Sequence, residues 1–164
     1  TDSGKSLSTE QLMSTPNRPH PSRLVFLGRP LSSSQMLSGT PNISLKLSIV
    51  NRRAANLTVT VIEYNRQGRA KIVTRGWADP QNYRDLTEGE LLSPGRNYQI
   101  SFELEPKQHT FAVGSQIGIM VTATDTAHTI RPDAGTQFRV HLGQNSFIQL
   151  HLSEPHRVLS LLPN

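Results

Sequence analysis

Short runs in which apolar and polar residues alternate make up most of this chain, and a period of two is typical of strands that bury one face. The clearest run is residues 43–49, where every second residue is aliphatic and the residues between are Ser or Lys. Residues 57–62 repeat the pattern, and we expect the two runs to be neighbouring antiparallel strands. Because no stretch has the 3.6-residue period of an amphipathic helix, the chain is predicted to be all-β.

Other strands are expected where β-branched or alternating apolar residues lie between Gly or Pro turns. These are residues 23–27, 70–77, 98–105, 117–124, 138–142 and 147–152. A turn is expected at 37–41, a turn of helix at 86–92, and a hairpin between the last two strands, across which His141 faces His151. Residues 158–162 are predicted to form a final strand or a segment that docks on a neighbour. About eight strands at short, regular spacing favour a β-sandwich.

The first 22 residues differ from the rest in composition. They are rich in Ser, Thr, Pro and Asn, with only scattered apolar residues. We expect a linker or an arm that lies on another surface and contributes no core element. Residues 23–164 then form one domain, long enough to bury a core without disulfides. The chain starts without methionine, and we expect it to be a piece of a longer or processed protein.

Composition excludes several classes of protein. With no cysteine, the chain has no disulfide, no thiol nucleophile and no Cys-based zinc site. The net charge is +5, but the 17 Lys and Arg residues are scattered, so we expect no nucleic-acid partner. No apolar run approaches the roughly 20 residues of a membrane span, so we expect no membrane partner. The lack of cysteine says little about compartment, because many secreted bacterial proteins also lack it. We expect an extracellular location, with the cytoplasm as the alternative.

No motif for a self-contained active site is present. The six histidines lack the short His-x-His or His-x3-His spacing that directs two imidazoles at one metal ion. In the segment 114–118, Gly-Ser-Gln-Ile-Gly, the serine occupies the wrong position for a nucleophile elbow. We therefore expect no catalytic residue, no metal and no cofactor in this chain alone.

The only tryptophan, Trp77, lies between Arg75 and Asp79 at the end of a predicted strand. One hypothesis is a sugar-stacking platform with a charged rim, which makes carbohydrate a candidate partner. The alternative is structural: Trp77 packs over the edge of a sheet, and its charged neighbours pair with each other or with a partner domain.

Three segments are distinctive: LSGTP at 37–41, TRGWADPQN at 74–82, and GSQIGIMVTATDTAHTIRPDAGT at 114–136. Together they resemble the C-terminal domain of Xaa-Pro dipeptidyl-peptidases and of related cocaine-esterase-like α/β-hydrolases. The resemblance covers roughly residues 23 to 152. One departure is at 114–116, where this chain has Gly-Ser-Gln and the family usually has Gly-His-Arg.

The resemblance implies a galactose-binding-like jelly roll that follows an α/β-hydrolase domain in a serine peptidase. That peptidase removes N-terminal Xaa-Pro dipeptides, and its catalytic residues lie in the hydrolase domain, so none is assigned here. We expect a noncatalytic accessory domain whose partner is that hydrolase domain. Candidate interdomain or ligand-face residues are Arg75, Trp77, Asp79, Asp125 and Arg131. A carbohydrate-binding module is the alternative, and a protein-interaction module or inhibitor stays open.

Overall fold

A computed structural model of the chain describes residues 1–2, 7–130, 133–154 and 157–160, with only the backbone described in the last of these ranges. Its described residues form eleven strands, one α-helix and one 3-10 helix. The strands are β1 (Arg23–Leu27), β2 (Gln35–Gly39), β3 (Asn42–Ile49), β4 (Leu57–Tyr64), β5 (Ala70–Ala78), β6 (Asn97–Glu103), β7 (Lys107–Phe111), β8 (Gln116–Thr122), β9 (Phe138–His141), β10 (Phe147–Leu150) and β11 (Arg157–Ser160). No helix in the described ranges is long and apolar enough to cross a membrane.

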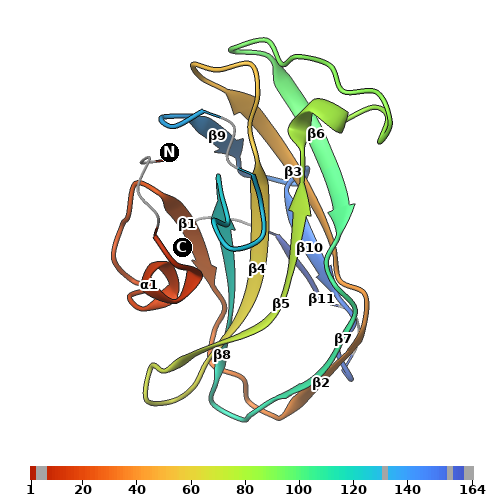
Figure 1. Cartoon of the computed structure of the whole chain (residues 1–164). Coiled ribbons are helices and arrows are strands. Elements are labelled where there is room, and N and C mark those ends of the chain that lie inside the picture. Colours follow the sequence, from red (N-terminus) through yellow and green to blue (C-terminus); the bar gives the residue numbers. More distant parts are fainter. Residues whose placement is uncertain (3–6, 131–132, 155–156, 161–164) are drawn as a thin grey trace.

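The strands form two main sheets, and every pairing is antiparallel. The first sheet has the order β1-β8-β4-β5. The second has the order β11-β10-β3-β6, and β9 also pairs with β3. A separate two-stranded ribbon, β2 with β7, lies at one end of the molecule (Figure 1). The prediction of a central strand at 117–124 is confirmed by β8, which has β1 on one side and β4 on the other.

The core lies between the two sheets. Leu45 and Leu47 of β3 are fully buried, as are Val59 and Val61 of β4 and Ile119 of β8, and all belong to one apolar cluster. The alternation seen in the sequence therefore corresponds to inward-facing side chains from both layers. This arrangement confirms the predicted all-β sandwich. The jelly-roll subtype stays a prediction.

The prediction that residues 43–49 and 57–62 are neighbouring strands is wrong. They form β3 and β4, which lie in different sheets. Residues 50–56 carry the chain from one layer to the other. The alternation of apolar and polar residues cannot distinguish the two arrangements. A strand buries every second residue whether the next strand along the chain lies beside it in the same sheet or faces it across the core.

Three local predictions also differ from the structure. The expected turn at 37–41 is largely strand β2, because buried Gln35 and Leu37 alternate with exposed residues as β2 pairs with β7. The expected hairpin does not form, since β9 and β10 both pair with β3 at successive stretches. His141 therefore lies opposite Lys46 and not opposite His151. No helix forms at 86–92, and the 3-10 helix η1 lies earlier, at Pro80–Asn82.

The N-terminal arm packs on the outer face of the first sheet. Its helix α1 (Thr9–Met13) begins with a capping box at Ser8 and buries Leu12 and Met13. These side chains form a second apolar cluster with residues of β4 and β8, and the Tyr64 hydroxyl donates to the Met13 carbonyl at 3.0 Å. The expectation that this segment contributes no core element is wrong. A single helical turn is too short to show a period in the sequence.

Leu12→Ala is expected to lower the free energy of unfolding by about 2 kcal/mol, because it leaves a cavity under α1. Urea denaturation followed by circular dichroism measures the effect. Glu10→Ala is the matched control, since Glu10 is exposed on the same helix and its loss is expected to change little. Equal stability of Leu12→Ala and wild type would show that the arm is not part of the folded unit.

Candidate functional site

Two of the predicted site residues lie on β5 and face away from the core. Arg75 and Trp77 flank Gly76, so their side chains share one face of the strand and Gly76 faces the other way. A Cβ on Gly76 would lie 2.8 Å from the Glu103 carbonyl oxygen and 2.8 Å from the Leu104 Cα. This close approach of two backbone segments fixes the direction of β5, and it places Arg75 and Trp77 on the outer face of the first sheet.

Asp125, just after β8, joins Arg75 and Trp77. Its Oδ2 accepts from Arg75 Nη1 at 3.1 Å and from the Trp77 indole nitrogen at 3.2 Å. The imidazole Nδ1 of His128 lies 3.1 Å from Oδ1. The Asp125 side chain is only 3% exposed. We call these four residues, Arg75, Trp77, Asp125 and His128, the Asp125 cluster.

The electrostatics of the Asp125 cluster favour an ionised carboxylate. Burial alone raises the pKa of Asp125, but hydrogen bonds from His128, Trp77 and Arg75 outweigh it and leave the pKa below its ordinary value. His128 also stacks on Trp77, with ring centroids 5.4 Å apart and an interplanar angle of 29°. The indole is therefore covered on one side, and its N–H is already bonded.

The Asp125 cluster holds the segment after β8 on the first sheet. The Asp125 carbonyl accepts from the backbone N–H groups of His128 and Thr129, which closes a tight turn. His128 was not among the residues predicted from the sequence. Its spacing of three residues from Asp125 is the signal that could have identified it, because such a turn brings the two side chains together. The cluster contains no hydroxyl or thiol nucleophile.

A fourth predicted residue, Asp79, is not brought into this cluster. Asp79 is the N-cap of η1, where its Oδ1 accepts from the backbone N–H of Gln81 at 2.8 Å. That contact gives Asp79 a local structural role. Arg131 lies outside the described residues.

Three loops meet at the end of the sandwich away from the β2–β7 ribbon, and we call this region the loop end (Figure 1). It comprises residues 50–56, 79–96 and 123–130. The backbone N–H of Leu92 donates to the Arg53 carbonyl at 2.8 Å, and the Asn56 side-chain amide donates to the Ile130 carbonyl. The loop end exposes large apolar side chains to solvent: Leu86 is 87% exposed, Leu91 57% and Ile130 92%.

Ser115, in the Gly-Ser-Gln-Ile-Gly segment, is buried and has a structural role. Its hydroxyl donates to the Ala112 carbonyl at 2.7 Å. The neighbouring Glu63 carboxylate accepts from the Ala112 N–H at 2.9 Å, and its other oxygen lies 2.8 Å from His109 Nε2. These contacts fasten the turn after β7 to β4.

Glu63→Gln is expected to lower the free energy of unfolding at pH 7 by about 1 kcal/mol. Burial alone raises the pKa of Glu63, but hydrogen bonds with Ala112, His109 and Ser115 lower that pKa below its ordinary value of 4.5. The stabilisation from the carboxylate is therefore fully present above pH 4.5 and is lost as the pH falls further. Urea midpoints of wild type and variant, measured from pH 7 to pH 3, should converge in acid. The control is Glu103→Gln, because Glu103 is an exposed residue at the end of β6. If Glu63→Gln has the same urea midpoint as wild type at pH 7, the prediction is refuted.

Comparison with known proteins adds a family match over nearly the whole chain. Residues 1–159 match the family model described as "X-Pro dipeptidyl-peptidase C-terminal non-catalytic domain". A putative Xaa-Pro dipeptidyl-peptidase of Bacillus cereus is 36% identical over 138 residues, which cover 84% of this chain and 23% of the relative. The counterpart in Rhodopirellula baltica is 42% identical over 126 residues, covering 73% and 20%. The chain thus spans less than a quarter of the length of these curated relatives.

Two solved structures share the fold. An alpha-amino acid ester hydrolase superimposes with a TM-score of 0.70 at 18% identity, covering 81% of this chain and 26% of the other. A CocE/NonD family hydrolase from Staphylococcus aureus gives a TM-score of 0.68 at 16% identity, covering 79% and 30%. At identities of 18% and 16%, these similarities show a shared fold and nothing further.

Proposed function

Because the chain belongs to the family of X-Pro dipeptidyl-peptidase C-terminal non-catalytic domains, we propose that it supports an α/β-hydrolase domain of the same protein, which removes N-terminal Xaa-Pro dipeptides. The observation that carries this proposal is the extent of the match, which includes both the N-terminal arm and the strands of the two sheets. The matched part of each relative is a minor share of its length. Bond cleavage is therefore assigned to the catalytic domain.

The loop end is the surface best suited to contact that catalytic domain. Leu86, Leu91 and Ile130 expose apolar area whose removal from water favours association. The Asp125 cluster and the Asn56 contact hold the 123–130 loop in place beneath Ile130, so little ordering is required on docking. Interfaces between domains of one chain are commonly built on loops of this kind.

A carbohydrate-binding role gains no support from the geometry. Trp77 is not a free platform, since the His128 ring stacks on it and its N–H donates to Asp125. A sugar would have to displace contacts that hold the loop on the sheet.

The docking surface can be tested by binding. The hydrolase domain encoded by the same gene is expressed without residues 1–164 and titrated with this chain in a calorimeter. The double variant Leu86→Asp with Ile130→Asp is expected to bind at least about tenfold more weakly than wild type, because it places charge in an apolar contact.

Val113→Asp is the matched control. Like Leu86 and Ile130, Val113 is an exposed apolar residue, with 46% of its surface exposed. It lies in the turn between β7 and β8, away from the loop end. It should leave the affinity unchanged. Wild-type binding by the double variant, or an equal loss in Val113→Asp, would show that the loop end is not the contact surface.

A further inference from the structure

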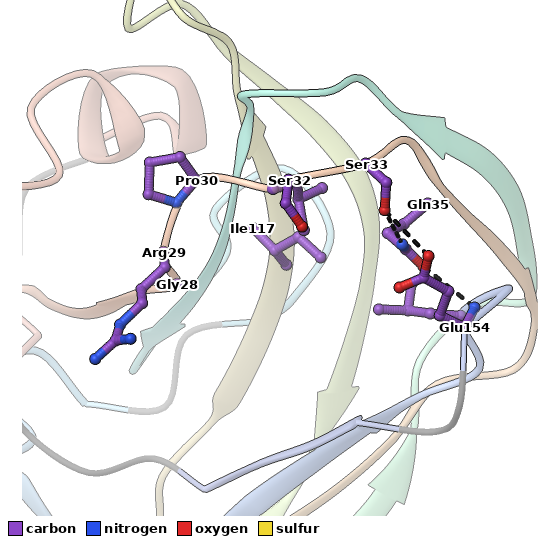
Figure 2. Close-up of a pocket in the computed structure, with 10 residues that line it drawn as sticks. Gly28, Arg29, Pro30, Ser32, Ser33, Gln35, Ile117 and Glu154 are labelled. Atoms are coloured by element: carbon purple, nitrogen blue, oxygen red, sulfur yellow. Dashed lines mark hydrogen bonds between the residues drawn. The ribbon is translucent and has the colours of Figure 1, made fainter.

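A cavity of about 380 Å³ opens between the loop that follows β1 and the segment that follows β10 (Figure 2). Leu31, Ile117 and Leu152 give it an apolar lining, and Ser32, Ser33 and Gln35 add hydroxyl and amide groups. Its volume lies within the range of about 300–1,000 Å³ that small-molecule sites occupy.

The walls of the cavity are fixed by hydrogen bonds. On one side, the backbone N–H groups of Gly28 and Leu31 donate to the carbonyls of Ile117 and Ser115, each at 2.8 Å. On the other side, buried Gln35 Oε1 accepts from the backbone N–H of Glu154 at 3.2 Å. The cavity is therefore formed before any ligand arrives.

Two charged residues of opposite sign line this cavity. Figure 2 shows Arg29 and Glu154 at opposite ends of the row of lining residues. The Glu154 carboxylate accepts from the Ser33 hydroxyl at 3.1 Å through Oε1. Among the described residues, neither Arg29 nor Glu154 forms an ion pair. Figure 2 also shows the exposed Arg29 side chain pointing away from the other lining residues. Once that side chain turns toward the cavity, the apolar lining has a cation at one end and an anion at the other, which complements a molecule with the reverse order of charges.

We propose that this cavity binds a zwitterionic apolar peptide of two or three residues, with its ammonium group on Glu154 and its carboxylate on Arg29. The apolar side chains of the peptide pack on Leu31, Ile117 and Leu152. Ser33 holds the Glu154 carboxylate toward the cavity, and the exposed Arg29 side chain turns to the carboxylate of the ligand. This site would give the domain a ligand of its own, whichever domain it supports.

Nuclear magnetic resonance of the ¹⁵N-labelled chain tests the site with L-leucyl-L-leucine as the probe. Saturable shifts are expected at the amides of Leu31, Ile117 and Glu154. N-acetyl-leucyl-leucine, which lacks the cation, and leucyl-leucine amide, which lacks the anion, are each expected to bind about threefold more weakly, as for a solvent-exposed ion pair. Absence of saturable shifts up to the solubility limit, or equal affinity for the three peptides, overturns the proposal.

Two variants locate the binding. Ser32→Phe fills the cavity and is expected to abolish the shifts, whereas Ser34→Phe, on the same loop but outside the lining, retains them. Glu154→Gln is expected to remove the difference between free and acetylated peptide while the spectrum stays that of a folded chain. Retained binding in Ser32→Phe, or a retained difference in Glu154→Gln, contradicts the assignment even if the other variant fails to fold.

Discussion

Asp125→Ala is expected to lower the free energy of unfolding by about 3 kcal/mol, the largest effect of any single change in the Asp125 cluster. The substitution removes the acceptor for Arg75 and Trp77 and leaves both donors facing a nearly buried site. The cost is that of a broken ion pair plus unsatisfied donors. Urea denaturation at pH 7 measures it as a lower midpoint with an unchanged slope.

The loss of stability in Asp125→Ala should depend on pH, because the Asp125 carboxylate must be ionised to stabilise the fold. The pKa of folded Asp125 lies below the ordinary aspartate value of 3.8, so its contribution is present above that pH and is lost below it. Asp79→Ala is the matched control, because Asp79 only caps η1 and its loss is expected to cost about 1 kcal/mol. If Asp125→Ala is no less stable than Asp79→Ala, the Asp125 cluster does not hold the loop on the sheet.

Gly76→Val is expected to lower the free energy of unfolding by about 3 kcal/mol, through overpacking between the sheets. A Cβ at this position would lie 2.8 Å from two backbone atoms of residues 103 and 104, which cannot turn away as a side chain end can. β5 and the segment after β6 must therefore separate. Because Arg75 and Trp77 flank Gly76, the separation should also disturb the Asp125 cluster and quench or shift the Trp77 fluorescence.

Gly89→Val is the control for Gly76→Val. A Cβ on Gly89 would first meet the Asn82 side-chain oxygen at 3.0 Å, in an exposed loop where that side chain can move. Its expected cost is below about 0.5 kcal/mol, as for ordinary surface changes. Equal urea midpoints for the two variants would mean that the close approach at Gly76 does not constrain the fold.

The strands could be predicted from the sequence because burial of one face leaves a direct trace in it. β3 and β4 appear as alternation, and β8 appears as a run apolar on both faces. Their partners could not be predicted in this way. The alternation in β3 and β4 would be the same if the two strands were paired in one sheet or packed across the core. Only the path of residues 50–56 determines which arrangement forms.

The candidate site was partly predictable. Arg75, Trp77 and Asp125 lie together in the structure, although about 50 residues separate β5 from Asp125, a distance that no local pattern spans. Their role at an interface stays a prediction. We grouped these residues because the segments 74–82 and 114–136 both resemble the same family. The contribution of His128 depends on the turn at Asp125, and the burial of Leu12 depends on a single helical turn, so neither is visible as a period.

The central claim is that this domain supports catalysis without performing it, and hydrolysis of alanyl-prolyl-p-nitroanilide tests it most directly. The chain alone, folded and at the concentration used for binding, is predicted to release no p-nitroaniline above buffer, whereas the hydrolase domain from the same gene with the chain added is predicted to release it. Release by the purified chain alone that persists through repeated purification would contradict the account.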